Sequence, residues 1–438
     1  MTTRIYFVII FLATVPLWGQ EEGTVAETPA MTTPPPVSGE AYATEGASLA
    51  RSNYVSGGLT FNSAYTDNLL GGLVQKPVSD VSYSVWPTIA LDETTPRLHT
   101  TLTYSPGFTF YQRTSAYDQA NQNVGVALQY RLSPHVTLSV GDSLHKLSSV
   151  FNQPDLLAVA PVSGSTQPAP IAVIAPTADQ LYNTGYVEVT DQFSRNAMVG
   201  ASGTLTNLHY SDLTQVSGLY NSNSKGGSAF YTHRLSRKHY VGATYQYTKF
   251  VATRTEELSE TQSHSVLLFY TFYFKPTLSL SFSGGPQHVD VGQPLLPVFQ
   301  AWSPSGAVSL GWQGRHTAFA ASYSRAVAAG GGLIGGFNSN NAALSARQQL
   351  TRQWSAGLSG GYSIYKPLNS PLLSSNSGGH TISGSASIQR TFGTHLNAEL
   401  GYTRLYQSYG GIAAVSTFPN VNREAISISY QFARPLGR

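Results

Sequence analysis

Residues 124–135 read VGVALQYRLSPH, and this stretch decides the fold of the chain. Across residues 124–130 large apolar side chains alternate with small or polar ones, the period-two pattern of a β-strand with one apolar face. The strand ends at Arg131, and Arg131 to His135 form a short turn with Pro134 at its centre. The stretch therefore predicts a strand that leads directly into a tight turn.

The same unit recurs along the chain. Alternating strands lie at residues 241–248, 278–283 and 396–403. Further turns of the same style lie at Gln192–Asn196, Arg234–Lys238, Gln349–Gln353 and Arg390–Thr394, with weaker ones near Glu93, Lys275 and Gly314. Successive turns are 36 to 42 residues apart, except for one interval of about 61. Such a period predicts a repeat of strand, connection, strand and tight turn.

The two kinds of connection differ in length. The tight turns alternate with looser segments at residues 151–178, 212–224, 290–299, 329–341, 367–379 and 409–421. Short turns at one end and long loops at the other are typical of transmembrane β-barrels, whose turns face the periplasm and whose loops are extracellular. Eight turns give nine hairpin-linked pairs, so we predict an all-β, antiparallel, up-and-down barrel of about 18 strands, with 16 as the alternative count.

Composition supports a membrane surface. Only 11% of the 438 residues are charged, against roughly 25% in soluble domains. No apolar run after Trp18 is long enough for a spanning helix, so a membrane crossing must use the strands of a closed barrel. The absence of Cys excludes disulfides and thiolate metal sites.

The first 52 residues are predicted to lie outside the barrel. Arg4, an apolar stretch from Ile5 to Trp18 and the small Gly19 are typical of an export signal, so we predict a signal peptide over residues 1–19. Residues 20–52 are acidic, contain a Pro34–Pro36 run and almost no large apolar residues, which predicts a disordered periplasmic linker. The barrel is assigned to residues 53–438.

The last strand carries a resemblance. Ile426, Ile428, Tyr430 and Phe432 alternate with polar residues, and the chain resembles the bacterial outer-membrane β-barrels, a porin-like class. The resemblance implies an outer-membrane location, contact with its lipid, and recognition of this strand by the barrel assembly machinery. The chain departs from the class pattern because six residues follow Phe432.

The alternation also predicts which residues line the lumen of the barrel. The face opposite the apolar one is mostly Ser, Thr, Gly, Gln and Asn, with scattered ionisable residues that we predict to face the lumen: His99, Arg131, Glu188, Arg347 and Glu399. Basic residues gather at the turns, whereas acids gather on the loop side, where Glu256, Glu257, Glu260 and Asp290 are predicted to line an extracellular vestibule. This segregation predicts a weak cation preference.

The sequence contains only weak matches to catalytic motifs. Gly357, Ser359 and Gly361 match a nucleophile elbow but lie inside a predicted strand, and the glycine-rich match at residues 330–335 precedes no helix. A membrane-embedded hydrolase would need a loop-side histidine, with His145, His209, His288 and His380 as the candidates. We therefore expect no enzyme, no cofactor, no metal and no nucleic-acid partner, and the oligomeric state stays open.

The predicted function is an outer-membrane pore for small, mostly neutral solutes, since barrels of 16 to 18 strands leave an aqueous channel. Two alternatives remain. One is an export channel for a polymer such as an exopolysaccharide, and the other is a binding or adhesive barrel acting through loops Leu156–Ala178 and Gln293–Phe299. The apolar, proline-rich segment 151–178 is also predicted to fold inward and narrow the channel.

This topology can be tested by labelling. Single cysteines at Ser133, Ser236 and Thr351 should resist a membrane-impermeant thiol reagent in intact cells, because these turns face the periplasm. Cysteines at Ser165 and Ser375 should react, because they lie in extracellular loops. Labelling of the turns from outside would reverse the topology.

Overall fold

The strands of this chain form a ring rather than an open sheet. The computed structural model describes residues 53–70, 76–147, 179–211, 219–254, 257–292, 297–329, 336–368, 378–410 and 419–436, all within one unit of the chain. The predicted signal peptide, the predicted linker and the whole of segment 151–178 lie outside these ranges. Among the described residues, no helix is long and apolar enough to cross a membrane.

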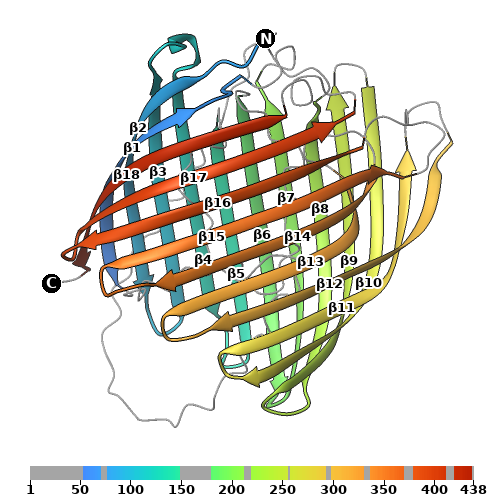
Figure 1. Ribbon diagram of the computed structural model, residues 1–438. Coiled ribbons are helices and arrows are strands. Elements are labelled where there is room, and N and C mark those ends of the chain that lie inside the picture. The colour runs from blue at the N-terminus through green and yellow to red at the C-terminus, as the bar shows by residue number, and fades with distance from the viewer. Residues whose placement is uncertain are drawn as a thin grey trace, which may run out of the picture. The chain divides into compact units, whose positions relative to one another are not determined.

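Eighteen antiparallel strands pair in chain order (Figure 1). Their bounds are β1 Tyr54–Thr66, β2 Asp80–Thr94, β3 Leu98–Tyr111, β4 Gln119–Arg131, β5 Val136–Leu147, β6 Gln180–Ser194, β7 Ala197–Tyr210, β8 Asn221–Arg234, β9 His239–Arg254, β10 Glu257–Lys275, β11 Leu278–Gly292, β12 Phe299–Gln313, β13 Thr317–Ala329, β14 Gly336–Gln349, β15 Trp354–Pro367, β16 Gly379–Phe392, β17 Leu396–Tyr409 and β18 Asn420–Pro435. A short 3₁₀ turn, η2 (Ser115–Tyr117), lies between β3 and β4.

The ring closes between its first and last strands. β1 pairs with β18 over its full length, from Tyr54 opposite Pro435 to Thr66 opposite Arg423. Tyr54 also pairs with Asp92 at the turn end of β2, so both ends of the barrel lie on the turn side, as the even strand count predicts. At this seam the Phe432 ring lies against Gly57, where an added Cβ would be 2.5 Å from Phe432 Cζ.

The eight predicted tight turns are confirmed. Each joins an even-numbered strand to the next and contains two to four residues. The opposite connections are mostly longer, but β9 and β10 are joined by only residues 255 and 256. β9 and β10 therefore extend to the residues on either side of this short connection, and Glu257 and Glu260 lie within β10.

The outer face is apolar. Large apolar side chains alternate with buried small or polar ones, and Leu268, for example, is 66% exposed between buried Ser265 and Thr271. Exposed Tyr65, Tyr104, Phe193 and Phe392 are aromatic residues of the outer face. Tyr210, Phe250 and Tyr240 are instead buried on the inner face, because each lies one residue out of phase with its outward neighbours.

Prolines interrupt the ladder without shifting it. Pro87 stands opposite Pro106 where the β2–β3 pairing is broken, and the register is the same on both sides of the gap. Pro87 is therefore accommodated without a β-bulge in the β2–β3 pairing. A second pair, Pro286 and Pro304, lies opposite each other on β11 and β12. Proline has no N–H to donate, so each position lacks one ladder hydrogen bond.

The lipid-facing assignment of the outer surface can be tested with a charge. Leu268→Arg should destabilise the barrel by about 2–4 kcal/mol, because a guanidinium would replace a leucine in hydrocarbon. Leu235, which is similarly exposed but lies in the β8–β9 turn, is the matched control, and Leu235→Arg should cost about 0–1 kcal/mol. Equilibrium unfolding in lipid vesicles measures both, and equal losses would contradict the assignment.

Candidate functional site

The inner wall is lined by hydroxyl and amide groups. Many of its side chains bond to each other across neighbouring strands, as in the Oγ–Oγ contacts of Ser202 with Ser228 (2.7 Å) and Ser359 with Ser385 (2.6 Å). Ser359, the serine of the elbow-like motif, is thus one of many wall serines. This wall offers neutral hydrogen-bonding groups along the lumen.

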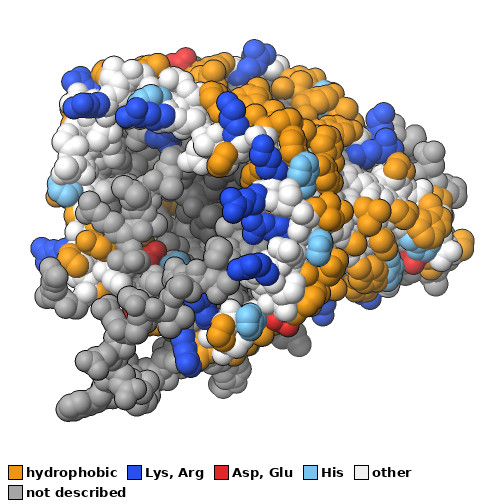
Figure 2. All heavy atoms as spheres, turned by 90° about the horizontal axis from the view of Figure 1, so that it is seen from below, with side chains coloured by type: hydrophobic (Ala, Val, Ile, Leu, Met, Phe, Trp, Pro, Cys, Tyr) orange, Lys and Arg blue, Asp and Glu red, His pale blue; other side chains and the backbone are white. Residues whose placement is uncertain are grey.

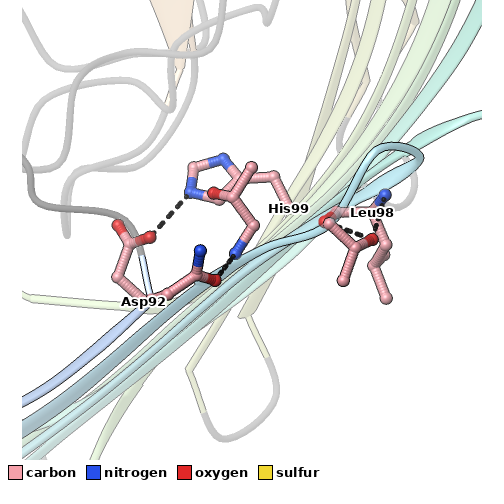
Figure 3. A network of polar contacts seen from close by, with 6 residues as sticks. Asp92, Leu98 and His99 are labelled. Atoms are coloured by element: carbon pink, nitrogen blue, oxygen red, sulfur yellow. Dashed lines mark hydrogen bonds and ion pairs between the residues drawn. The ribbon is translucent and has the colours of Figure 1, made fainter. Parts of the chain in front are cut away.

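The five ionisable residues predicted for the lumen have inward positions in the alternation. His99 Nε2 lies 3.3 Å from Asp92 Oδ1, and Figure 3 shows both side chains projecting toward each other from β2 and β3. Arg347 donates from Nη2 to Gln389 Oε1 at 3.0 Å. Glu188 is only 4% exposed, whereas Arg131 and Glu399 lie near the turn end of β4 and β17.

Other inward ionisable residues were not singled out from the sequence, although the same alternation identifies them. Among them are Asp80, Asp92, Arg234 and Arg423. Acids and bases are therefore mixed along the wall rather than separated by sign.

The predicted vestibule acids occupy different places. Glu260 shares the outward phase of Leu258 and Val266, and its Oε1 forms an ion pair with Lys249 Nζ at 2.7 Å on the outer face. Asp290 shares the outward phase of His288, whose ring lies tilted against the exposed Trp302 with 4.7 Å between the ring centroids. The lining role predicted for these two acids is corrected, because alternation within a strand, not proximity to a loop, decides the face.

Glu256 lies outside the described residues, and only the backbone of Glu257 is described. The candidate histidines are also separated. His145 faces inward and contacts Asn123 Oδ1 at 3.0 Å, whereas His380 stacks on Tyr406 on the outer face. No group of three or more potential metal ligands occurs within the described ranges.

The turn-side mouth is basic. Figure 2 looks at this end and shows Lys and Arg side chains gathered around the rim. A hollow of about 430 Å³ lies here, next to the inward Arg347 and the turn residues Arg315 and Arg352. Arg390 does not contribute to it, because its guanidinium carbon lies 5.2 Å above the Trp354 ring and 4.6 Å above the Phe392 ring on the outer surface.

The loop-side mouth is narrowed by strands. We use β13–β14 tip for residues 326–329 and 336–339. The β12–β13 pairing ends at Gly306 opposite Arg325, so the tip has no ladder partner on β12. Two positions further in that register, Val327 would lie opposite Pro304, which has no N–H to donate.

The side-chain amide of Gln287 on β11 satisfies backbone groups of the β13–β14 tip that have no ladder partner on β12. Its Nε2 donates to Val327 O at 3.0 Å, and its Oε1 accepts from Val327 N at 2.7 Å. Gln287 lies on the inner face, so these bonds hold the β13–β14 tip inside the barrel.

Apolar packing completes this contact. Val327 and Leu368 form a buried cluster with Val289 and Val291 of the inner β11 wall. A Cβ at Gly336 would lie 3.3 Å from Val291 Cγ2, so the tip rests directly on the wall. The barrel is thus narrowed at the loop end by its own strand ends.

Comparisons with solved structures find other barrels at low similarity. Three examples are the outer membrane protein OpdK of Pseudomonas aeruginosa (12% identity, TM-score 0.42, 87% of this chain and 99% of that chain), OccAB4 of Acinetobacter baumannii (10%, 0.43, 88% and 99%) and OpdQ of Pseudomonas aeruginosa (10%, 0.43, 87% and 98%). No protein-family model and no curated protein matches the chain.

The assignment of the fold rests on the closed strand pairing and on the two opposite faces of the wall. An apolar outside, a polar inside and turns all at one end occur together in transmembrane barrels. The chain is a transmembrane β-barrel. As in any such barrel, the outer face contacts lipid and the inner face contacts whatever enters the lumen.

Gln287 gives this barrel a testable contact. Gln287→Leu would leave the Val327 N–H and C=O without their partner, at a cost of about 1–3 kcal/mol, and should release the β13–β14 tip. Single-channel conductance in planar bilayers should rise. Gln431→Leu, on the inner face of β18 near the turns, is the control and should leave conductance unchanged.

A reducible cross-link provides the converse test. Because the chain has no cysteine, Gln287→Cys with Val327→Cys introduces only two thiols, which a short disulfide-containing bis-maleimide can join across the span that the Gln287 side chain fills. Conductance of the cross-linked barrel should be low and should rise when the linker is cleaved by reduction. Unchanged conductance in both experiments would show that the tip does not control the pore.

Proposed function

We propose that this barrel is an outer-membrane pore for small, uncharged polar solutes. The observation that carries the proposal is the inner wall, on which hydroxyl and amide side chains far outnumber ionised ones. A solute that leaves bulk water loses hydrogen bonds, and a wall of Ser, Thr, Asn and Gln replaces them without favouring either sign of charge. The 18-strand ring supports the same function, because barrels of this size enclose an aqueous channel.

Charge selectivity is expected to be weak. The inner wall carries acids such as Asp92 and Glu399 as well as bases such as Arg234 and Arg347, so no long stretch has one sign. The cation preference predicted from the sequence loses its main support, because Glu260 and Asp290 face outward. The proposal is therefore confined to neutral solutes with little discrimination between ions.

Neither alternative function gains support from the described residues. Loop Leu156–Ala178 lies outside them, and only residues 297–299 of the Gln293–Phe299 loop are described. The polymer-export alternative would use the same lumen, which the narrowed loop-side mouth makes less suitable for a wide chain.

The proposal includes how the barrel reaches the membrane. A cleaved leader at residues 1–19 and a linker at 20–52 would deliver residues 53–438 to the periplasm. Ile426, Ile428, Tyr430 and Phe432 form an exposed outward row on β18, and we propose this row as the surface read by the barrel assembly machinery.

Flux can be tested with matched solutes. Proteoliposomes should swell faster in glucose than in gluconate or glucosamine of similar size, and the two charged solutes should enter at similar rates. Faster entry of either charged solute than of glucose would contradict the proposal.

A matched pair of variants shows whether solutes pass through the lumen. Gly401 is on the inner face of β17, and an added Cβ there would meet nothing within 4 Å. Gly401→Trp should therefore narrow the lumen and slow swelling several-fold. Leu400→Trp, one residue away on the exposed outer face, should not. Equal rates in the two variants would show that the flux does not use this lumen.

A further inference from the structure

One row of inward side chains is polar on every strand it crosses. Following the register from β3 to β12, the row consists of His99, Gln129, Ser139, Glu188, Ser202, Ser228, Gln246, Ser265, Gln287 and Ser303. We call it the polar row. Each member can donate or accept a hydrogen bond, and neighbours are spaced by the interstrand distance of about 4.8 Å.

The two adjacent inward rows are interrupted. On the loop side the row contains Ala127, Gly141, Gly226 and Val289. On the turn side it contains Gly200, Phe230 and Leu267. The continuity of the polar row is therefore not a general property of this wall.

The polar row climbs through the barrel. His99 is the second residue of β3 from its turn end, whereas Gln287 and Ser303 hold the β13–β14 tip near the loop end. Strands of a closed barrel are tilted by roughly 35–45°, so a row perpendicular to them runs obliquely along the axis. The row connects the basic turn-side mouth with the narrowed loop-side mouth.

Glu188, in the first half of the row, has an unused acceptor. The side chain is 96% buried, and Glu188 Oε2 has no hydrogen-bond partner in the part of the chain that the structure describes. A buried carboxylate oxygen without a donor is costly, so a donor from a bound molecule would stabilise it. A hydroxyl group supplies such a donor without adding charge.

Aromatic rings flank the polar row at this point. The Tyr186 ring lies against Gly141, where an added Cβ would be 2.3 Å from Tyr186 Cε1. On the other side of the row, the Phe230 ring lies against Gly200 in the same way, with 2.4 Å from that Cβ to Phe230 Cε1. Both rings therefore lie along the wall, beside Glu188 and Ser228. A sugar ring has polar hydroxyl edges and apolar C–H faces, and this surface offers a partner for each.

We propose that the polar row is a binding track for polyhydroxylated solutes, with its strongest subsite at Glu188, Ser202 and Ser228 between Tyr186 and Phe230. This inference rests on the proposed pore function and names its solute class as sugars and polyols. Successive donors and acceptors let such a solute exchange hydrogen bonds step by step, so that no single site holds it tightly.

The test uses maltotriose as the probe in planar bilayers. Maltotriose should interrupt the KCl current of the unaltered barrel. Ser202→Ala and Gln246→Ala should each weaken this block by about two- to tenfold, the effect of losing one hydrogen bond. Thr204→Ala and Thr244→Ala are the controls, because they lie on the same strands in the adjacent rows and should leave the block unchanged.

Glu188 has its own series. Glu188→Ala should reduce the block at least as much as Ser202→Ala, and Glu188→Gln should restore most of it, because an amide still hydrogen-bonds to hydroxyls. Every variant should keep the KCl conductance of the unaltered barrel, which excludes loss of folding as the cause.

The outcomes separate the inference from the pore function. Glucose swelling with no maltotriose block, or equal effects of row and control variants, would overturn the track and leave the pore standing. A barrel that neither conducts KCl nor passes glucose would overturn the proposed function itself. Weaker block in the row variants alone supports the track.

Discussion

Every backbone N–H and C=O that faces hydrocarbon must have a partner within the protein, and the rest of this structure depends on that constraint. No water is available in the bilayer core, so an open edge would leave several unpaired groups at a cost of several kcal/mol each. Pairing of β1 with β18 over thirteen positions removes the edge. The closed ring then requires an even strand count and places both ends of the barrel on the turn side.

Closure also turns the alternation along each strand into two surfaces. One phase meets lipid and the other meets the lumen, so a shift of one residue changes the environment of a side chain completely. Glu260 and Lys249 illustrate this, because they are loop-side charges that pair with each other outside rather than lining a vestibule. On the inner face, by contrast, Ser202 forms a hydrogen bond with Ser228, and Arg347 forms one with Gln389. The inner wall is therefore polar, and its acids and bases leave little net charge of either sign.

Where the ladder fails, the structure shows how the constraint is met otherwise. Pro304 cannot donate toward β13, and the β12–β13 pairing stops two residues before it. The β13–β14 tip, which lacks a ladder partner on β12, forms hydrogen bonds with the side chain of Gln287 instead. It also packs against Val289 and Val291. Because these contacts hold the β13–β14 tip against the inner wall, they also narrow the loop-side mouth. The missing backbone donor at Pro304 therefore affects the width of the pore.

The sequence by itself determined the alternating strands, the eight tight turns, a strand count of about 18 and the inward phase of His99 and Glu188, because these depend on local alternation and on turn residues. It did not determine which acids lie at the mouth, since Glu260 and Asp290 lie within strands whose alternation turns both side chains to the outer face. Only the tertiary structure decided the inward fold of the β13–β14 tip and the polar row. Both join residues from different strands, and the register that aligns Glu188 with Ser202, or Gln287 with Val327, is a property of the closed sheet and not of any one segment.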